Sequence, residues 1–288
     1  MAENEHYAGA SGPDLSHAVT VFVTTVGAPT IASCLAHLRK QDCRFRLHVI
    51  DHVAPMHAAF QRMIDDCRTP YYAQVDEDML LYPHAVRTLH ARIDAAGPNV
   101  AMFAADLYDV HLDRCIIGVK IFRHEIVRQY PFVASDAFET WQVRQFTGDG
   151  YGVVRNTPGK TPVPGQTLGL HGTQWTAQSI YERYTTLERR RRTNPPQSRW
   201  LEAYSGEFLR RFLHEPSEHN FFALMGIIAG TLAARSGPAP AKDYRTYAAL
   251  PGFHALRAFL AAFDHGAASA ERAVDTSAAA EDMPPAAL

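Results

Sequence analysis

The sequence lacks several features that would assign a chain to a class directly. Its four cysteines, Cys34, Cys43, Cys67 and Cys115, include no C-x-x-C pair. This argues against a structural zinc site and against a disulfide framework. The formal net charge is only -2, whereas a nucleic-acid-binding protein is usually strongly basic. We therefore expect free thiols in a reducing compartment and no nucleic-acid partner.

Long apolar runs are missing as well. The longest, FFALMGIIAGTLAA from Phe221 to Ala234, is shorter than the stretch of ~20 apolar residues that a transmembrane helix needs. A buried or interfacial helix fits it better. The first 17 residues are polar and contain no apolar segment of the secretory type. These observations predict a cytoplasmic protein without a transmembrane segment, and they leave peripheral contact with a membrane open.

What is present is the composition of a soluble globular chain, with 288 residues of which 47% are hydrophobic and 20% charged. Strand-like apolar segments alternate with helix-like segments in its first part. This alternation predicts an α/β fold, with a mixed but mainly parallel sheet and helices on both faces. The predicted strands are 18–27, 45–51, 71–78 and 99–110, and the predicted helices are 28–42, 56–68 and 83–97.

The second part of the chain has a less regular pattern. RCIIGVKIFRHEIV, at 114–127, predicts a strand pair or a strand with a short helix, and 151–154 predicts a further strand. Beyond Trp175 the pattern is helical. We therefore predict a flexible N-terminus at 1–17, an α/β domain at 18–175 with halves at 18–110 and 111–175, a helical segment at 176–265, and a disordered tail at 266–288.

Three acids, Asp76, Glu77 and Asp78, follow the third predicted strand. In open α/β sheets, ligands bind beyond the carboxyl ends of the strands. Carboxylate oxygens suit Mg²⁺ or Mn²⁺, which complete their coordination with phosphate oxygens and water. We predict that Asp76 and Asp78 flank one ion, and that Glu77 points elsewhere and tolerates substitution. A pair of solvated turn acids is the alternative that this pattern leaves open.

The ordered series VFVTTVG, FRLHVID and YYAQVDEDMLLYP resembles the nucleotide-binding half of the family-2 glycosyltransferases, which have the GT-A fold. The resemblance covers roughly residues 18 to 175. It implies a metal-dependent enzyme that moves a sugar from a nucleotide-diphosphate donor to an acceptor hydroxyl, with Mn²⁺ or Mg²⁺ as the cofactor. It further implies the donor-site residues, which are Thr24, Thr25 and Asp51 for the nucleotide, Arg62 as a phosphate neighbour, and Asp76 and Asp78 for ribose, pyrophosphate and metal.

Glycosyl transfer passes through an oxocarbenium-like state, so an inverting enzyme needs a carboxylate to accept the proton of the acceptor. The resemblance places this base in FVASDAFETWQVRQFTGDGYGVV, where Asp136 and Glu139 are the candidates. Asp136 is also a suitable helix N-cap, so both remain open. His171, between the glycines of LGLHG, is implied as a further metal ligand, although the chain has 15 histidines.

The C-terminal part of the chain bears on the acceptor and on the oligomeric state. QSRW, at 197–200, is one residue short of the Q-x-x-R-W of processive synthases, so we predict transfer of single sugars to a glycan, lipid-linked or small-molecule acceptor. A homodimer is compatible with the helical segment. The run Arg189–Arg192 is expected to be a solvated helix end or a mobile loop. The functional alternatives are a lid over the donor diphosphate and a patch that meets a phospholipid-linked acceptor.

Two other functions compete with glycosyl transfer. A nucleotidyltransferase should carry a glycine-rich, basic first loop, but TTVGAPT has one glycine and no basic residue. A non-catalytic protein that binds a sugar or nucleotide is the other alternative, because the adjacent E-D pair of the family is missing.

Overall fold

The computed structural model describes residues 6–8, 12–135, 137–156, 167–193, 198–237 and 252–262. The chain divides into two compact units, Met1–Arg245 and Thr246–Leu288, and the second contributes a described helix at 253–262. The base candidate Asp136 and the predicted tail at 266–288 lie outside the described residues. The domain boundaries drawn from the sequence stay a prediction.

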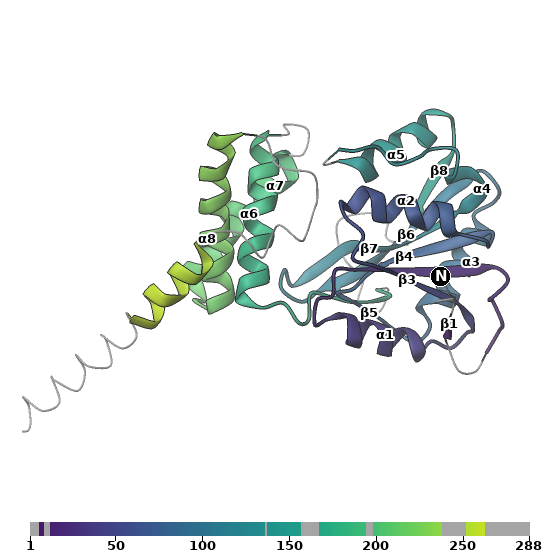
Figure 1. Ribbon diagram of the computed structural model, residues 1–288, viewed down its shortest axis with the longest axis horizontal. Helices are drawn as coiled ribbons and strands as arrows, with labels where there is room; N and C mark the ends of the chain where they lie inside the picture. The colour runs from purple at the N-terminus through teal and green to yellow at the C-terminus, as the bar shows by residue number, and fades with distance from the viewer. Residues whose placement is uncertain are drawn as a thin grey trace, which may run out of the picture. The chain divides into compact units, whose positions relative to one another are not determined.

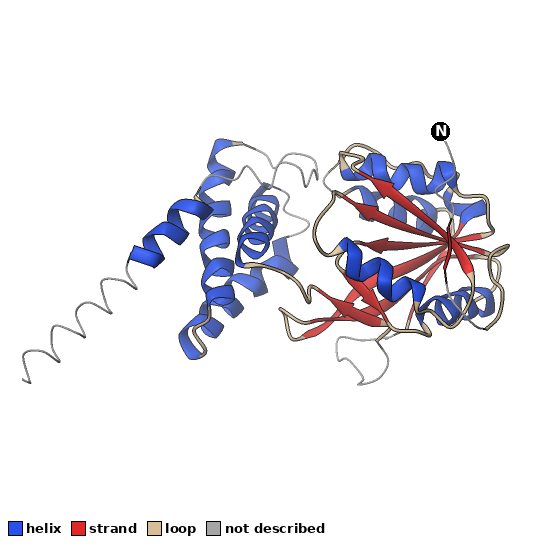
Figure 2. Cartoon of the chain, turned by 60° about the horizontal axis from the view of Figure 1, so that its bottom comes forward, coloured by secondary structure: helices blue, strands red, loops and turns tan. Residues whose placement is uncertain are grey.

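A mixed nine-stranded sheet forms the centre of the first unit (Figures 1 and 2). Its order is β1-β3-β2-β4-β7-β6-β9-β5, and β8 pairs with β6 outside this path. β2 runs parallel to β3 and β4, whereas β7 lies antiparallel between β4 and β6. The strands are β1 (His6–Ala8), β2 (Val19–Thr25), β3 (Phe45–Asp51), β4 (Tyr71–Asp76), β5 (Met79–Leu81), β6 (Val100–Asp109), β7 (Arg114–Arg123), β8 (Gly152–Arg155) and β9 (Gly169–His171).

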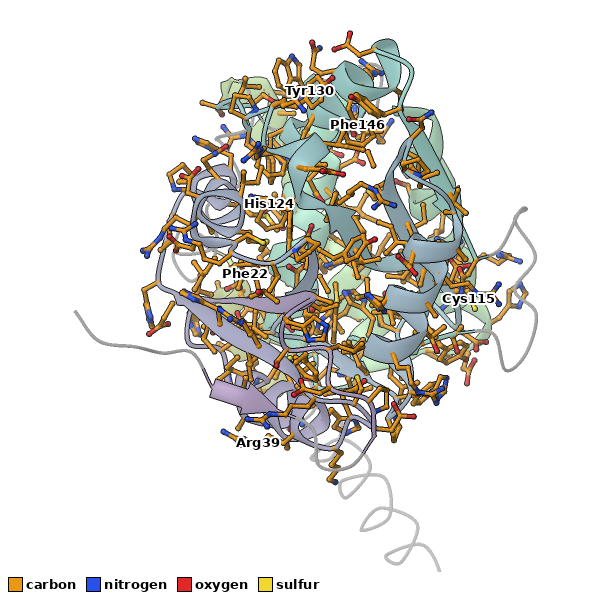
Figure 3. All side chains as sticks on the ribbon, turned by 90° about the vertical axis from the view of Figure 1, so that its right-hand side faces the viewer. Phe22, Arg39, Cys115, His124, Tyr130 and Phe146 are labelled. Atoms are coloured by element: carbon orange, nitrogen blue, oxygen red, sulfur yellow. The ribbon has the colours of Figure 1, made fainter. Side chains whose placement is uncertain are left out.

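Helices cover both faces of the sheet because side chains alternate along each strand. In β2, Val21 belongs to the core beneath α1 and α3, while Phe22 belongs to the core beneath α2, α4 and α5. Tyr130 and Phe146 pack in this second core with ring centroids 6.1 Å apart (Figure 3). The helices are α1 (Ile31–Arg39), α2 (Met56–Asp66), α3 (Ala85–Ala95), α4 (His124–Val127), α5 (Phe138–Gly148), α6 (Ala177–Thr193), α7 (Ser198–His214) and α8 (Glu218–Ala233), followed by the 3₁₀ turn Ala234–Ser236.

The predicted fold class is confirmed, namely a mixed α/β sheet flanked by helices and followed by a helical part. The predicted strand at 45–51 coincides with β3, and the segment at 114–127 is the strand β7 with the short helix α4. The strand predicted at 71–78 ends at Asp76, because the chain turns there and continues as β5. The free thiols are also confirmed, since all four cysteines are unpaired.

Two glycines allow α8 to pack closely against α6. A Cβ atom at Gly226 would lie 2.5 Å from the carbonyl oxygen of Tyr181, and one at Gly230 would lie 2.4 Å from that of Thr185. The apolar GIIAG run therefore belongs to a partly buried helix, as predicted. None of the described helices combines the length and the apolar character needed to cross a membrane.

The arginine run at the end of α6 is only partly exposed to solvent. Arg190 is 3% exposed, and Arg191 and Arg192 each bring Nε within 2.6 Å of a carboxylate oxygen of Glu188. Burial raises the pKa of Glu188, but hydrogen bonds from these two arginines outweigh it and lower the pKa. A solvated helix end is thus the wrong description for Arg190, which is buried, whereas the side chains of Arg191 and Arg192 are 13% and 43% exposed.

Candidate functional site

The carboxyl ends of β2, β3 and β4 bring the predicted donor residues to one edge of the sheet. The register places Thr24 opposite Asp76 and Thr25 opposite Asp51. The Thr24 hydroxyl donates to Oδ1 of Asp76 over 3.0 Å. Four of the predicted residues therefore lie together, as the parallel pairing of these strands requires.

Glu77 fixes the loop between β2 and α1. Its carboxylate accepts hydrogen bonds from the Thr25 hydroxyl and from the backbone N–H groups of Val26, at 3.3 Å, and Ala28, at 3.0 Å. Gly27 lies between these donors with φ +82°, a left-handed conformation that favours glycine. The prediction that Glu77 points away is therefore wrong, because its side chain holds the first loop. These contacts argue against its tolerance of substitution, which stays a prediction.

Asp51 ends β3 with an exposed carboxylate. Its Oδ1 lies 2.5 Å from Nδ1 of His52, whose backbone has φ +53°. The His52 ring lies over Gly27, where a Cβ atom would be only 3.0 Å from the ring. Asp51 and His52 thus form an exposed part of this sheet edge, next to the loop between β2 and α1 that Glu77 holds.

Asp78 and His171 meet on the other side of β4, although they are far apart in the sequence. Strand β9 pairs with both β5 and β6, which places His171 opposite Met79 and opposite Asp109. Nε2 of His171 lies 3.3 Å from Oδ2 of Asp78, and its Nδ1 lies 2.8 Å from Oδ2 of Asp109. The histidine ring is therefore held between two carboxylates.

The pair Asp78 and His171 fits a divalent cation as two of its ligands. Two ligand atoms about 2.1 Å from Mg²⁺ and at right angles to each other are about 3 Å apart. The observed 3.3 Å between Oδ2 and Nε2 is close to this separation. Within the described part of the chain, no group of three His, Cys, Asp or Glu side chains is arranged to hold a metal. A cation held by these two side chains would need further ligands, such as oxygens of a bound molecule or water.

Trp175 orients the carboxylate of Asp78 and was not predicted from the sequence. Its Nε1 donates to Oδ2 of Asp78 over 3.1 Å, and its ring lies edge-on to His171 with centroids 5.1 Å apart. The Arg183 guanidinium lies over the Trp175 ring, 4.3 Å from its centroid. Gly172, with φ +71°, leaves room for the ring, since a Cβ there would lie 3.1 Å from it.

Asp109 is the second residue that sequence reasoning missed. It is wholly buried at the end of β6, and burial raises its pKa. The hydrogen bond and charge of His171, with the Leu112 N–H, outweigh burial and lower the pKa below its usual value. The rule that selected Asp51 also finds Asp109, because it too is an acid at the end of a strand whose carboxyl end lies at this edge.

The base candidate Glu139 forms an ion pair with Lys120 of β7. Nζ of Lys120 lies 2.5 Å from Oε1 of Glu139. Burial lowers the pKa of Lys120, but the charge and hydrogen bond of Glu139, together with the charge of Asp76, raise it overall. Glu139 therefore lies on the Asp76 side of the edge. The sequence signal for this ion pair was the lone lysine in the apolar run IIGVKIF, because lysine is rarely buried without a charged partner.

Arg62 is the one described candidate that the structure does not bring to this edge. Its guanidinium lies 3.3 Å from Oδ2 of Asp66, on an exposed face of α2. The same Asp66 carboxylate lies 3.9 Å from Nε2 of His48, which is in the middle of β3 and not at its carboxyl end. A phosphate contact from Arg62 stays a prediction, and the ion pair with Asp66 does not support it.

Comparison with known proteins gives distant structural likenesses only. No protein-family model matches the sequence, and no curated protein matches it. The mannosyltransferase PcManGT of Pyrobaculum calidifontis, solved with GDP-Man and Mn²⁺, is similar over 89% of this chain and 83% of its own, with 16% identity and a TM-score of 0.43. TarS of S. aureus is similar over 58% of this chain and 38% of its own, with 12% identity and a TM-score of 0.40.

Glucosyl-3-phosphoglycerate synthase of Mycobacterium tuberculosis, solved with Mg²⁺ and UDP, is a third such protein. It is similar over 48% of this chain and 68% of its own, with 10% identity and a TM-score of 0.38. Likenesses of this strength carry no argument about activity.

Proposed function

We propose that this chain is a metal-dependent glycosyltransferase that uses a nucleotide-diphosphate sugar as its donor. The observation that carries the proposal is the convergence of Asp78 and His171, 3.3 Å apart, beside the Thr24–Asp76 contact. A carboxylate and an imidazole held this close supply two ligands to Mn²⁺ or Mg²⁺ and leave room for diphosphate oxygens.

The donor site follows from the neighbouring contacts. Asp51 and the Thr24–Thr25 segment would contact the nucleoside, and Asp76 would contact the ribose and pyrophosphate. Asp78 and His171 would hold the cation, which supplies a Lewis acid for the departing diphosphate when it is bound. Trp175 keeps the Asp78 carboxylate in place through its indole N–H.

The base that takes the proton of the acceptor hydroxyl would be Glu139, with Asp136 as the second candidate. Lys120 orients Glu139 through their 2.5 Å contact. A carboxylate on the face opposite the leaving group gives inversion of configuration. The acceptor would be a glycan, a lipid-linked or a small molecule that receives a single sugar, and a homodimer remains part of this proposal.

The contacts of Glu77 disfavour the nucleotidyltransferase alternative. A triphosphate site in the first loop would need free backbone N–H groups there. The N–H groups of Val26 and Ala28 are instead bound to the Glu77 carboxylate, whose negative charge would repel phosphate. Only a measurement of turnover distinguishes an enzyme from a non-catalytic protein that binds the same sugar or nucleotide.

The proposal is tested by measuring sugar release from a panel of UDP-, GDP- and dTDP-sugars with Mn²⁺. We expect turnover of at least one donor that is lost with excess chelator and in Asp78→Asn. Asp66→Asn, at the end of α2 and beside the middle of β3, is the matched control and should keep the activity. Full activity in Asp78→Asn or in chelator would contradict the metal-dependent mechanism, and nucleotide binding without turnover of any donor would favour a non-catalytic protein.

A further inference from the structure

Asp109 is a buried acid whose two carboxylate oxygens both have fixed partners. Oδ2 accepts from Nδ1 of His171 over 2.8 Å, and Oδ1 accepts from the backbone N–H of Leu112 over 2.7 Å. The residue is 0% exposed. An acid in such a place is costly unless it is paired, and the partner that explains its position is His171.

The contact with Asp109 determines how His171 can act. A neutral imidazole that donates its proton from Nδ1 keeps its lone pair on Nε2. In this structure Nε2 is the nitrogen that faces Asp78. Ligand histidines commonly donate their other ring N–H to a carboxylate, which fixes both the tautomer and the ring orientation.

The turn that carries Leu112 is itself held in place by α7. The Arg211 guanidinium donates to the carbonyl oxygens of His111, at 3.0 Å, and Leu112, at 2.5 Å. Leu112 is therefore bound at its N–H by Asp109 and at its carbonyl by Arg211. This leaves the Asp109 carboxylate one arrangement relative to the imidazole ring.

We infer that Asp109 is a positioning residue. It holds the proton on Nδ1 of His171 and turns the Nε2 lone pair toward Asp78, so that both side chains can receive the same divalent cation. The inference rests on the proposed function for the identity of the cation, but its effect on the imidazole tautomer can be measured without any metal.

The first test is the tautomer of His171 in the metal-free protein. Long-range ¹H–¹⁵N NMR on ¹⁵N-histidine-labelled protein, at a pH where the ring is neutral, distinguishes protonation at Nδ1 from protonation at Nε2. The signal is assigned by its loss in His171→Gln. We expect the Nδ1–H tautomer in the wild type, and a proton on Nε2 would overturn the inference, whether or not Asp109→Asn folds.

The second test is the Mn²⁺ affinity of the Asp109→Asn variant, measured by EPR with GDP or UDP present. An amide has one acceptor oxygen for two donors, so the variant should shift the tautomer and weaken Mn²⁺ binding by about 10- to 100-fold. Asp113→Asn, in the same turn, removes the same charge and should change neither. Circular dichroism establishes that each variant is folded.

The two tests separate the failure of this inference from the failure of the proposed function. Absence of Mn²⁺ binding to the wild type with either nucleotide contradicts the proposed function, and the tautomer then decides the inference. Equal Mn²⁺ affinity in the wild type and Asp109→Asn overturns the inference and leaves the function standing.

Discussion

The three neighbouring acids after β4 have three different sets of contacts. Asp76 accepts from Thr24, Glu77 binds the backbone of the first loop, and Asp78 faces His171. The turn that follows Asp76 allows this division, since an extended strand would send alternate side chains to opposite faces. Each acid should therefore respond differently to substitution.

Replacing Glu77 with glutamine should destabilise the fold. The amide oxygen would have to serve three donors, from Thr25, Val26 and Ala28, while its NH₂ group would face them. We expect the free energy of unfolding in urea to fall by about 1–3 kcal/mol. Glu125→Gln, at an exposed site, should change it by less than about 0.5 kcal/mol. Equal midpoints for Glu77→Gln and the wild type would refute the role of this loop contact.

His111 should make stability depend on pH. Its ring stacks on Phe208 with centroids 5.3 Å apart, and burial lowers its pKa from 6.5 to about 4. The unfolded chain binds this proton at a higher pH than the folded chain does. Stability is therefore fully present above pH 6.5 and is lost as the pH falls toward 4, by about 2 kcal/mol between pH 7.5 and 5.

This prediction is checked by urea unfolding at pH 7.5 and 5 for the wild type and His111→Phe. The aromatic replacement suits the ring contacts and removes the titrating group. The free energy of unfolding of His111→Phe should not show the decrease of about 2 kcal/mol between pH 7.5 and 5 that His111 causes in the wild type. The same pH dependence in both proteins would show that other groups cause it.

At the scale of whole elements, the α6–α8 pair depends on backbone contact at two glycines. Gly230→Ala would place a methyl group 2.4 Å from the Thr185 carbonyl oxygen, so the helices would have to move apart. We expect a loss of about 1–3 kcal/mol. The matched control is Gly206→Ala in α7, where a Cβ atom meets nothing within 4 Å. This substitution should raise the free energy of unfolding by about 0.4–1 kcal/mol. Thermal unfolding compares them, and a neutral Gly230→Ala would contradict the close packing.

The elements that could be predicted are those whose signals are local. The alternation of apolar runs gave β2, β3, β4 and β6 together with the helices between them, because strand and helix periods can be read within a few residues. The antiparallel insertion of β7 could not be predicted, since it depends on which strands pair across the sheet. The loop contact of Glu77 could not be predicted either, because it depends on the path that the backbone takes from Val26 to Ala28.

At the scale of the whole molecule, the candidate site is assembled by long-range strand pairing. Asp76 and Asp78 could be selected from their place after a strand, because ligands collect at the carboxyl ends of parallel strands. The contacts of His171 with Asp78 and Asp109, in contrast, become visible only when β9 joins β5 to β6. A single sequence indicates which residues reach the edge of the sheet, but not which of them meet.

The central claim is that Asp78 and His171 bind one cation together with a nucleoside diphosphate. The most direct test is calorimetry of GDP and UDP binding, with and without Mn²⁺, to the wild type, Asp78→Asn, His171→Ala and the double variant. We expect Mn²⁺ to strengthen nucleotide binding to the wild type, each single variant to lose at least about 10-fold in affinity, and the double variant to lose little more, because residues that share a ligand are not additive. Wild-type affinity that is unchanged by chelator, or variants that bind as the wild type does, would contradict the claim.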